Sequence, residues 1–536
     1  VLGELVRRLD GGAPADAARV LQQFLVDHAG SPRVPEALAL MVRALHERKS
    51  FGPAYGALLR LRTRFGDQLV TRADGARVAA RAFVEEWLAR DPYPALARSA
   101  QRRDLDPDLE LRFERAFPNE NFLDVPDLLG QRPEPLRHAI LVRAHRRVLT
   151  LDARDGNELY RIDFRRGEPK GPLVFAGERL HAVTDQHIHV FDARTGRALH
   201  ERRLPSNGRA ERLLEHQGQI FLLFRQRSLR GQVGLAALHP DDGSVLWSRV
   251  FDEGGMDPRM ATYQAIALAD RLLLFATHPV TLTSIDPTSG AVENSITLDR
   301  ERGTTLVEPI VLPDGRILVG LGTAQPLPRF EYKHSYTLAL VDPASPSPIW
   351  KEEAPHDGKS RYLHMLGVVG KHVVALDDAR GSAVYDLESG RLLKWAPELE
   401  LSDETGDRPY LDHPQPRHDS LLLVLTRSRE LGDQPARLTA FELPDLRRKY
   451  TLPLTEGGAQ TASLIPAEGV LGLKIWSRRR STPQPRIRLV DPLHGRALRE
   501  ILPPARNVEW INAKVQNGIL VVTTSANVVY AYGPGG

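Results

Sequence analysis

Residues with the chemistry of metal ligands come together at one place in this sequence. His187 and His189 alternate along a predicted strand, which places both side chains on the same side, and Asp185 has the same parity. Two histidines on one strand face can bind zinc when a third ligand joins them. Because no second cluster of such residues accompanies this one, we favour the alternative, a polar pair that flanks a turn at a sheet edge.

The usual signatures of catalysis and cofactor binding are absent from the sequence. It has no glycine-rich phosphate loop, no Gly-x-Ser-x-Gly elbow and no His-Glu-x-x-His helix. It also has no cysteine, which excludes disulfides, thiolate metal sites, iron–sulfur clusters and cysteine nucleophiles. We therefore assign no catalytic, cofactor-binding or metal-binding residue, expect no cofactor, and expect that the protein is not an enzyme.

Aspartates recur at one position of a repeated sequence motif, called the phrase below, where they could be mistaken for catalytic carboxylates. Each follows a hydrophobic strand and stands four residues before a glycine, after which a second strand begins. An aspartate at this place can bond the backbone N–H groups of a tight turn, and the glycine supplies the positive φ that ends the turn. We expect a structural role for these residues, which are Asp152, Asp192, Asp286, Asp386 and Asp491 with Gly156, Gly196, Gly243, Gly290, Gly390 and Gly495.

The repeated phrase predicts the fold. It returns every 40–56 residues from about His138 onward and occurs nine times when degenerate copies and the final strand, Val528–Tyr532, are counted. Repeats of this length with about four strands each describe a β-propeller. Because the first and last units look incomplete, we expect them to share one blade, which gives eight blades, with seven as the alternative. A tryptophan near the fourth position after the glycine is expected to pack between neighbouring sheets; the candidates are Trp247, Trp350 and Trp395.

The first 117 residues have a different pattern, typical of helices. Leu21, Phe24 and Leu25 share one helical face, and the segments that start at Asp16 and Pro53 align with each other at an offset of 37 residues. That offset is close to the tetratricopeptide (TPR) period of 34 residues. We therefore predict a helical TPR-like domain over 1–117, an extended Pro-rich linker over 118–137, and a propeller over 138–536 closed by N- and C-terminal strands. A generic helical bundle is the alternative for the first part.

Composition and charge narrow the class of partner. Apolar residues make up 42% of the chain, charged residues 26%, and the net charge is +4, which indicates a globular protein with a mixed-sign surface and no nucleic-acid partner. No apolar run approaches the length of a membrane span. The sequence starts at Val1, so we expect natural residues upstream of it through which membrane association is possible.

Two long insertions interrupt the repeat and are the predicted partner-binding loops. One contains Arg329, Phe330 and Tyr332, which mix apolar and charged groups. The other contains three consecutive arginines, Arg478, Arg479 and Arg480, directly after a predicted strand. Long loops in a compact propeller are often functional, because they do not help the fold. The alternative is that they are solvated loop tips.

The amino-acid sequence of the repeat also resembles that of a known family. Phrases such as Gly-Arg-Ala-Leu and Gly-Ser-Val-Leu-Trp resemble the pyrroloquinoline-quinone-like (PQQ-like, quinoprotein-type and BamB-like) propeller repeat rather than WD40, over residues 138–536. For quinoprotein dehydrogenases this resemblance implies a tryptophan-rich cofactor floor, a calcium site of Glu, Asn and Asp, an Asp base and often a vicinal disulfide. The chain has no cysteine and six tryptophans, three of them at the repeat position, so the resemblance to those enzymes stops at the scaffold.

The pairing of a helical arm with such a propeller resembles bacterial envelope proteins, especially the propeller lipoprotein of the outer-membrane β-barrel assembly machine. That resemblance implies a non-catalytic protein–protein interaction scaffold, periplasmic or envelope-associated, that acts as a subunit of a membrane-associated complex with other proteins as partners. Two alternatives stay open: a quinone- or metal-dependent enzyme acting in the propeller funnel, and a ligand- or glycan-binding sensor domain. A polar, convergent funnel favours a site, and an apolar or plugged funnel favours a scaffold.

Overall fold

The computed structural model describes most of the chain, with gaps. The described residues are 14–28, 31–47, 51–91, 93, 108–118, 120, 123–130, 132–133, 136, 138–205, 208–216, 219–226, 232–251, 263–268, 271–277, 279–299, 305–326, 332–355, 363–377, 381–396, 421–426, 437–454, 460–465, 470–477, 485–502, 508, 511–516 and 518–534.

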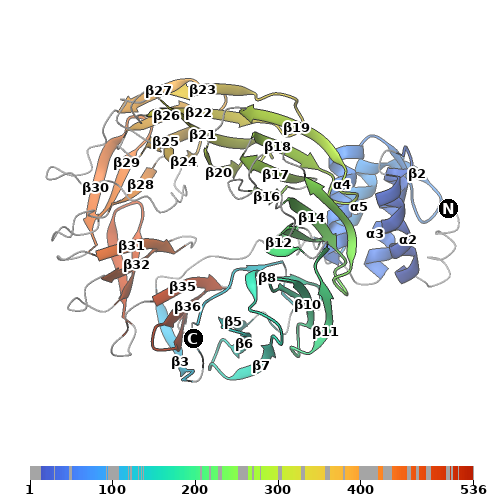
Figure 1. The fold of residues 1–536 in the computed structure, drawn as a ribbon, viewed down its shortest axis with the longest axis horizontal. Coiled ribbons are helices and arrows are strands. Elements are labelled where there is room, and N and C mark those ends of the chain that lie inside the picture. The colour runs from blue at the N-terminus through green and yellow to red at the C-terminus, as the bar shows by residue number, and fades with distance from the viewer. Residues whose placement is uncertain are drawn as a thin grey trace.

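The N-terminal part is a small helical domain that lies outside a ring of sheets (Figure 1). Its elements are α2 (Pro14–Asp27), α3 (Val34–Glu47), α4 (Phe51–Phe65), β1 (Leu69–Thr71), β2 (Arg77–Ala79) and α5 (Ala80–Leu88). Consecutive helices pack against each other, and α3, which is rich in Leu, Ala and Val, is buried along most of its length. The TPR-like repeat stays a prediction. None of the helices in the described part of the chain has the length and apolarity that crossing a membrane requires.

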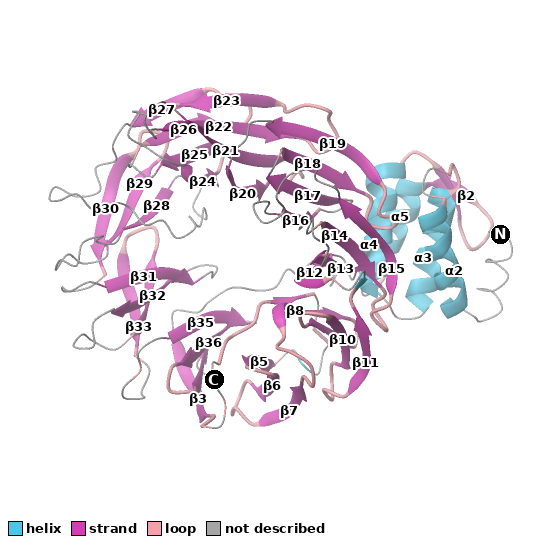
Figure 2. Ribbon diagram, in the orientation of Figure 1, coloured by secondary structure: helices cyan, strands magenta, loops and turns pink. Residues whose placement is uncertain are grey.

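The rest of the described chain forms nine antiparallel sheets, which are the blades of a propeller (Figure 2). Blades 1 to 3 contain β5 (Ala139–Ala144), β6 (Arg147–Asp152), β7 (Glu158–Asp163); β8 (Lys170–Ala176), β9 (Arg179–Val183), β10 (His187–Asp192), β11 (Ala198–Arg203); and β12 (Arg209–His216), β13 (Gln219–Arg225), β14 (Val233–Leu238), β15 (Val245–Phe251). Blades 4 to 6 contain β16 (Tyr263–Ala267), β17 (Leu272–Thr277), β18 (Val280–Ile285), β19 (Val292–Asp299); β20 (Thr305–Val311), β21 (Ile317–Pro326), β22 (Tyr332–Val341), β23 (Trp350–Ala354); and β24 (Leu363–Val369), β25 (His372–Asp377), β26 (Ser382–Asp386), β27 (Leu392–Ala396). Blades 7 to 9 contain β28 (Leu421–Thr426), β29 (Arg437–Glu442), β30 (Arg447–Pro453); β31 (Gln460–Ile465), β32 (Leu471–Ser477), β33 (Arg486–Asp491), β34 (Arg496–Ile501); and β35 (Ile511–Gln516), β36 (Ile519–Thr524), β37 (Val528–Pro534) with β3 (Leu109–Ala116).

The predicted β-propeller is confirmed, but the predicted number of blades is wrong. The sequence interpretation merged the first and last phrases into one blade and arrived at eight, with seven as the alternative. In the structure the first phrase joins β6 to β7 in a sheet of its own, and the last strand, β37, lies in another sheet. Each phrase therefore marks one blade, and the described residues form nine.

The ring is closed by residues that the sequence placed outside the propeller. Strand β3, within the expected helical domain, pairs antiparallel with β37 as the outer strand of blade 9. The expected linker also joins the propeller: β4 (Leu128–Leu129) pairs parallel with β8, and Asp124 forms a backbone bridge with Arg143 of blade 1. Described backbone groups of this segment bond to Arg143 of blade 1 and Leu173 of blade 2, and the carbonyl of Leu123 accepts a bond from the Thr523 hydroxyl of blade 9 at 3.1 Å. That the whole linker is extended stays a prediction.

The core of the propeller lies between neighbouring blades. Middle strands such as β14 and β36 are buried at every position, because each faces sheets on both sides, whereas the outer strand β11 is largely exposed. Each hydrophobic cluster mixes residues of two adjacent blades; one joins Phe221 and Trp247 of blade 3 to Leu272 and Ile285 of blade 4. This shared burial holds the ring together.

One contact repeats between blades. Trp247 and Trp350 each lie against the turn glycine of the next blade, and each indole Nε1–H donates to a carbonyl in that turn, at 3.0 Å and 2.9 Å respectively. The expected packing of these two tryptophans between sheets is therefore observed. Trp395 does not pack in this way and is 38% exposed. Tyr160 and Tyr450 make the same contact with the following blade, which the tryptophan pattern did not reveal.

Candidate functional site

The repeat turns form one class of polar site on the propeller. In each turn the aspartate side chain accepts backbone N–H groups two or three residues on; for Asp286 the donors are Thr288 and Ser289, both at 2.8 Å. The glycine N–H donates back to the aspartate carbonyl, and the glycine φ lies between 64° and 72° in these turns. These bonds use one carboxylate oxygen, Oδ1, and leave Oδ2 available to another donor.

Local hydrogen bonds lower the pKa of Asp152, Asp386 and Asp491. The Ser389 hydroxyl, followed by the Ser389 N–H, lowers the pKa of Asp386 below its usual value. The His494 side chain is the largest cause that lowers the pKa of Asp491, and the Arg154 side chain does the same for Asp152. Each of these three turns therefore presents a negative charge at neutral pH, and a carboxylate held this way is an acceptor rather than an acid catalyst.

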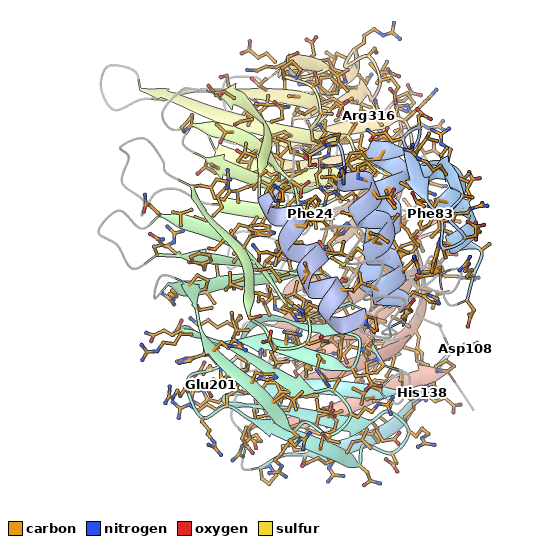
Figure 3. The ribbon with its side chains drawn as sticks, turned by 90° about the vertical axis from the view of Figure 1, so that its right-hand side faces the viewer. Phe24, Phe83, Asp108, His138, Glu201 and Arg316 are labelled. Carbon is orange, nitrogen blue, oxygen red and sulfur yellow. The ribbon has the colours of Figure 1, made fainter. Side chains whose placement is uncertain are left out.

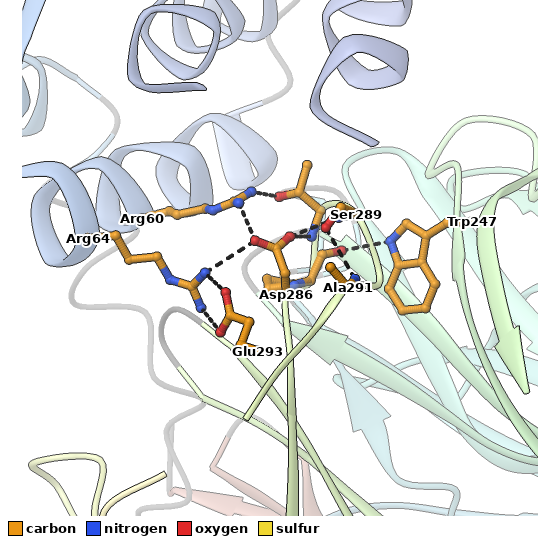
Figure 4. Close-up of polar contacts among 9 residues, drawn as sticks. Arg60, Arg64, Trp247, Asp286, Ser289, Ala291 and Glu293 are labelled. Atoms are coloured by element: carbon orange, nitrogen blue, oxygen red, sulfur yellow. Dashed lines mark hydrogen bonds and ion pairs between the residues drawn. The ribbon is translucent and has the colours of Figure 1, made fainter. Parts of the chain in front are cut away.

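The helical domain binds one of these turns directly, through an arginine of α4 (Figure 4). The guanidinium of Arg60 donates to Oδ2 of Asp286 and to the hydroxyl of Thr288. Both charged side chains of the pair are only 5% exposed. A buried arginine–carboxylate pair with additional hydrogen bonds fixes geometry, because leaving either charge without its partner is costly.

A second arginine one helical turn further along α4 extends the contact. Arg64 donates to Asp286 Oδ2 at 3.2 Å and, through its other terminal nitrogen, to Glu293 Oε2 at 2.7 Å. The spacing of four residues places both arginines on the same face of the helix. The side view in Figure 3 shows the helices, with Phe24 on α2 and Phe83 on α5, lying against the ring. The turn of blade 4 thus already binds a protein module.

The predicted partner-binding residues are mostly beyond what the structure describes. Arg329 and Phe330, and the three arginines Arg478, Arg479 and Arg480, lie outside the described residues. Tyr332 begins β22, and its backbone pairs with Pro326 at the end of β21. Their role in partner binding therefore stays a prediction. The sequence reasoning did not single out Arg60 or Arg64.

The histidine pair lies beside a single carboxylate, that of Glu201 on the neighbouring strand. His187 and His189 are buried side by side on β10, and Glu201 on β11 lies 3.9 Å from a ring nitrogen of each. Asp185, which has the same strand parity as the two histidines, instead pairs with Lys170 and Arg209. Burial is the largest cause that lowers the pKa of His189 to about 4, so this ring is neutral at pH 7. Among the described residues no group of three His, Cys, Asp or Glu side chains is arranged to hold a metal ion.

Charged residues on the inner strands near the ring closure are paired with each other. Asp127 accepts a bond from Lys514 at 2.7 Å, and Asp124 pairs with Arg143, whose other nitrogen donates to the carbonyl of Gly171 at 3.0 Å. These pairs join the closing segment to blades 9, 1 and 2. In this described part of the inner wall the carboxylates are neutralised by cations, an arrangement that favours a structural role over a set of converging catalytic carboxylates.

Several known proteins resemble this chain in part. Residues 144–325 match a family model described as outer membrane protein assembly factor BamB. No curated protein matches the chain. Similar solved structures include BamB from Moraxella catarrhalis, at 12% identity and a TM-score of 0.38 over 79% of this chain and 97% of that one. Another is the quinohemoprotein alcohol dehydrogenase from Comamonas testosteroni, at 12% identity and a TM-score of 0.43 over 80% of this chain and 77% of that one. A third is the dihydro-heme d1 dehydrogenase NirN, at 14% identity and a TM-score of 0.43 over 79% and 83%.

Proposed function

Because the chain is a PQQ-like β-propeller protein, we propose that it is a non-catalytic interaction scaffold and a subunit of a bacterial membrane- or envelope-associated complex. The observation that carries the proposal is the buried contact between Arg60 and Asp286, in which the propeller's own turn binds a helical protein module. One copy of the repeated turn binds a helix that carries arginines, so the turn is suited to binding proteins.

The setting of the proposed complex comes from the matched family. The description of that family names an outer membrane assembly factor, and it covers residues 144–325, about a third of the chain. We therefore propose a periplasmic or envelope location and other proteins of a larger complex as partners. The helical domain, in which we propose a TPR-like repeat, and the loops with Arg329 and Arg478 are the surfaces proposed to contact them.

Affinity purification from native membranes tests this proposal. The tagged natural protein is extracted gently and the retained proteins are identified and quantified by mass spectrometry. Envelope proteins retained in stoichiometric amounts are the expected result. Replacement of Arg478, Arg479 and Arg480 by alanine should reduce their recovery, whereas replacement of Arg62, an exposed arginine of α4, should not. A protein that elutes alone, with a bound metal or quinone absorbance, would instead favour an enzyme acting in the funnel.

A further inference from the structure

Two pairs of blades in this propeller are built in the same way. Trp247 of blade 3 lies on Gly290 of blade 4, and Trp350 of blade 5 lies on Gly390 of blade 6. In both pairs the indole N–H donates to the carbonyl of the residue after the turn aspartate. The turn sequences also correspond, because Asp, Ser and Gly occupy the same places in the turn that starts at Asp286 and in the turn that starts at Asp386. The grooves beside the two turns are therefore structurally equivalent.

The helical domain occupies the first of these grooves. Helix α2 contacts the outer strand β15 of blade 3, and α4 places Arg60 and Arg64 on the carboxylates of Asp286 and Glu293. Each arginine reaches the free oxygen of the turn aspartate, which its backbone bonds leave available. The chain thus shows what kind of element fits such a groove: a helix with two arginines one turn apart.

The second groove lies between β23 of blade 5 and the turn of blade 6 and encloses about 700 Å³. Its lining includes Glu352, Glu353, Tyr385, Ser389, Arg391 and Leu392. The two glutamates are exposed and form no ion pair within the described residues. They stand two and three residues after Trp350, where blade 3 has Arg249 and Val250 after Trp247. Among the lining residues the two glutamates outnumber the one cation, Arg391. Asp386 begins the adjoining turn, in which Glu388 is already paired with Arg316.

One buried unsatisfied hydroxyl and one accessible carboxylate oxygen point to a missing partner at the second groove. Tyr385 is 1% exposed, and its hydroxyl has no hydrogen-bond partner among the residues that the structure describes. A buried hydroxyl without a partner costs free energy that a bound acceptor would recover. Asp386 accepts bonds from Ser389 on Oδ1, and its Oδ2 accepts none from the described residues. In other turns of the repeat a local cation fills this place: Arg154 bonds Oδ2 of Asp152, and His494 bonds Oδ2 of Asp491.

We propose that the groove between blades 5 and 6 binds a helix of a partner protein that carries two arginines one turn apart. One arginine pairs with Asp386 Oδ2, as Arg60 pairs with Asp286 Oδ2. The other pairs with Glu352 or Glu353, because blade 6 has Leu393 where blade 4 has Glu293. The Tyr385 hydroxyl donates to a carbonyl or hydroxyl of the helix, and the helix covers Leu392, which is 42% exposed. This proposal rests on the scaffold function and names one of its binding sites.

The test uses the full chain and a defined probe. The probe is a fluorescein-labelled, stapled alanine-rich helix with arginines at positions i and i+4, and its control carries glutamines at both places. Binding is measured by fluorescence anisotropy with the wild-type protein, with the Glu352→Gln/Glu353→Gln variant, and with Glu85→Gln/Glu110→Gln, two exposed glutamates on α5 and β3 with the same change in net charge. The groove variant removes one exposed charge pair and should weaken binding about threefold to fivefold, whereas the glutamine probe removes two pairs and should weaken it about tenfold. The control variant should bind like wild type.

A second variant tests the hydroxyl. Tyr385→Phe keeps the ring and removes the donor, so it should weaken binding about threefold to tenfold. It should not lower the melting temperature, because the hydroxyl forms no bond with the described part of the protein. Equal binding by wild type and the groove variant, or equal binding of the arginine and glutamine probes, would overturn the proposal. The proposal would also be overturned if light scattering showed that the wild-type chain is a dimer and that the groove variant is a monomer, since the occupant of the groove would then be a second copy. If the probe does not bind but the affinity purification still retains partner proteins, this groove is not a binding site and the scaffold function still holds.

Discussion

The contact between helical domain and propeller makes a quantitative prediction about Arg60. In the Arg60→Met variant the aliphatic packing is kept and the charge is lost, so Asp286 stays buried without its main cation. Removing one partner of a buried ion pair usually costs about 3–5 kcal/mol. Here Arg64 lies 3.2 Å from the same oxygen, and two backbone N–H groups remain on the other. We therefore expect the variant to lose about 2–3 kcal/mol.

The assay is a double-mutant cycle in urea. Unfolding of wild type, Arg60→Met, Asp286→Asn and the double variant is followed by tryptophan fluorescence, because Trp247 bonds the carbonyl of Pro287 beside the site. The cycle should yield a coupling free energy of about 2 kcal/mol, since both substitutions remove the same contact. Arg62→Met, an exposed change on the same helix, should cost less than about 0.5 kcal/mol.

Two outcomes would refute this reasoning. If Arg60→Met is no more destabilising than Arg62→Met, the ion pair does not hold the helical domain in place. If the two substitutions at Arg60 and Asp286 are additive, each acts through other neighbours and the turn does not recognise the arginine.

Two further predictions concern the blade contact and the buried histidine. Gly390→Ala would place a Cβ 2.6 Å from the Trp350 ring at a φ of +68°, so it should lower the free energy of unfolding in urea by more than about 2 kcal/mol. The control is Gly315→Ala, which has a φ of +86° and nothing within 4 Å of the added Cβ, so it should cost only the backbone strain of about 1 kcal/mol. Equal losses in the two variants would contradict the contact between Gly390 and Trp350. His189 has a pKa lowered to about 4 when folded, against 6.5 in its ordinary state, so the unfolded chain binds more protons between these values and stability falls as pH drops from 6.5 towards 4. The loss should be about 2 kcal/mol at pH 5, and a His189→Gln variant should show a flatter stability–pH curve; parallel curves would contradict a neutral buried ring.

The fold was predictable from the sequence because each blade repeats its turn. The aspartate and glycine of that turn are needed for local geometry, so they stand in the sequence wherever a blade does. The number of blades was not predictable in the same way. Strand β3 carries no such phrase, and only its pairing with β37, more than 400 residues away, shows that it closes the ring. Tyr160 and Tyr450 were missed because only tryptophan was sought at a place that accepts any large ring with a polar edge.

The binding chemistry was harder to predict, since the repeat makes all turns look alike. The turns differ in which group bonds the second carboxylate oxygen, Oδ2, and this depends largely on the residues just after the aspartate. Where Arg154 or His494 follows within three residues, the turn supplies its own cation. Where Thr288 and Ser289 follow, or Glu388 and Ser389, no local cation is available, and the oxygen of Asp286 is taken by a helix from elsewhere in the chain. A turn aspartate with no basic residue at the next three positions is therefore a sequence signal for a docking turn. Among the turns that the structure describes it selects Asp286, which is occupied, Asp342, and Asp386, which we propose is occupied by a partner.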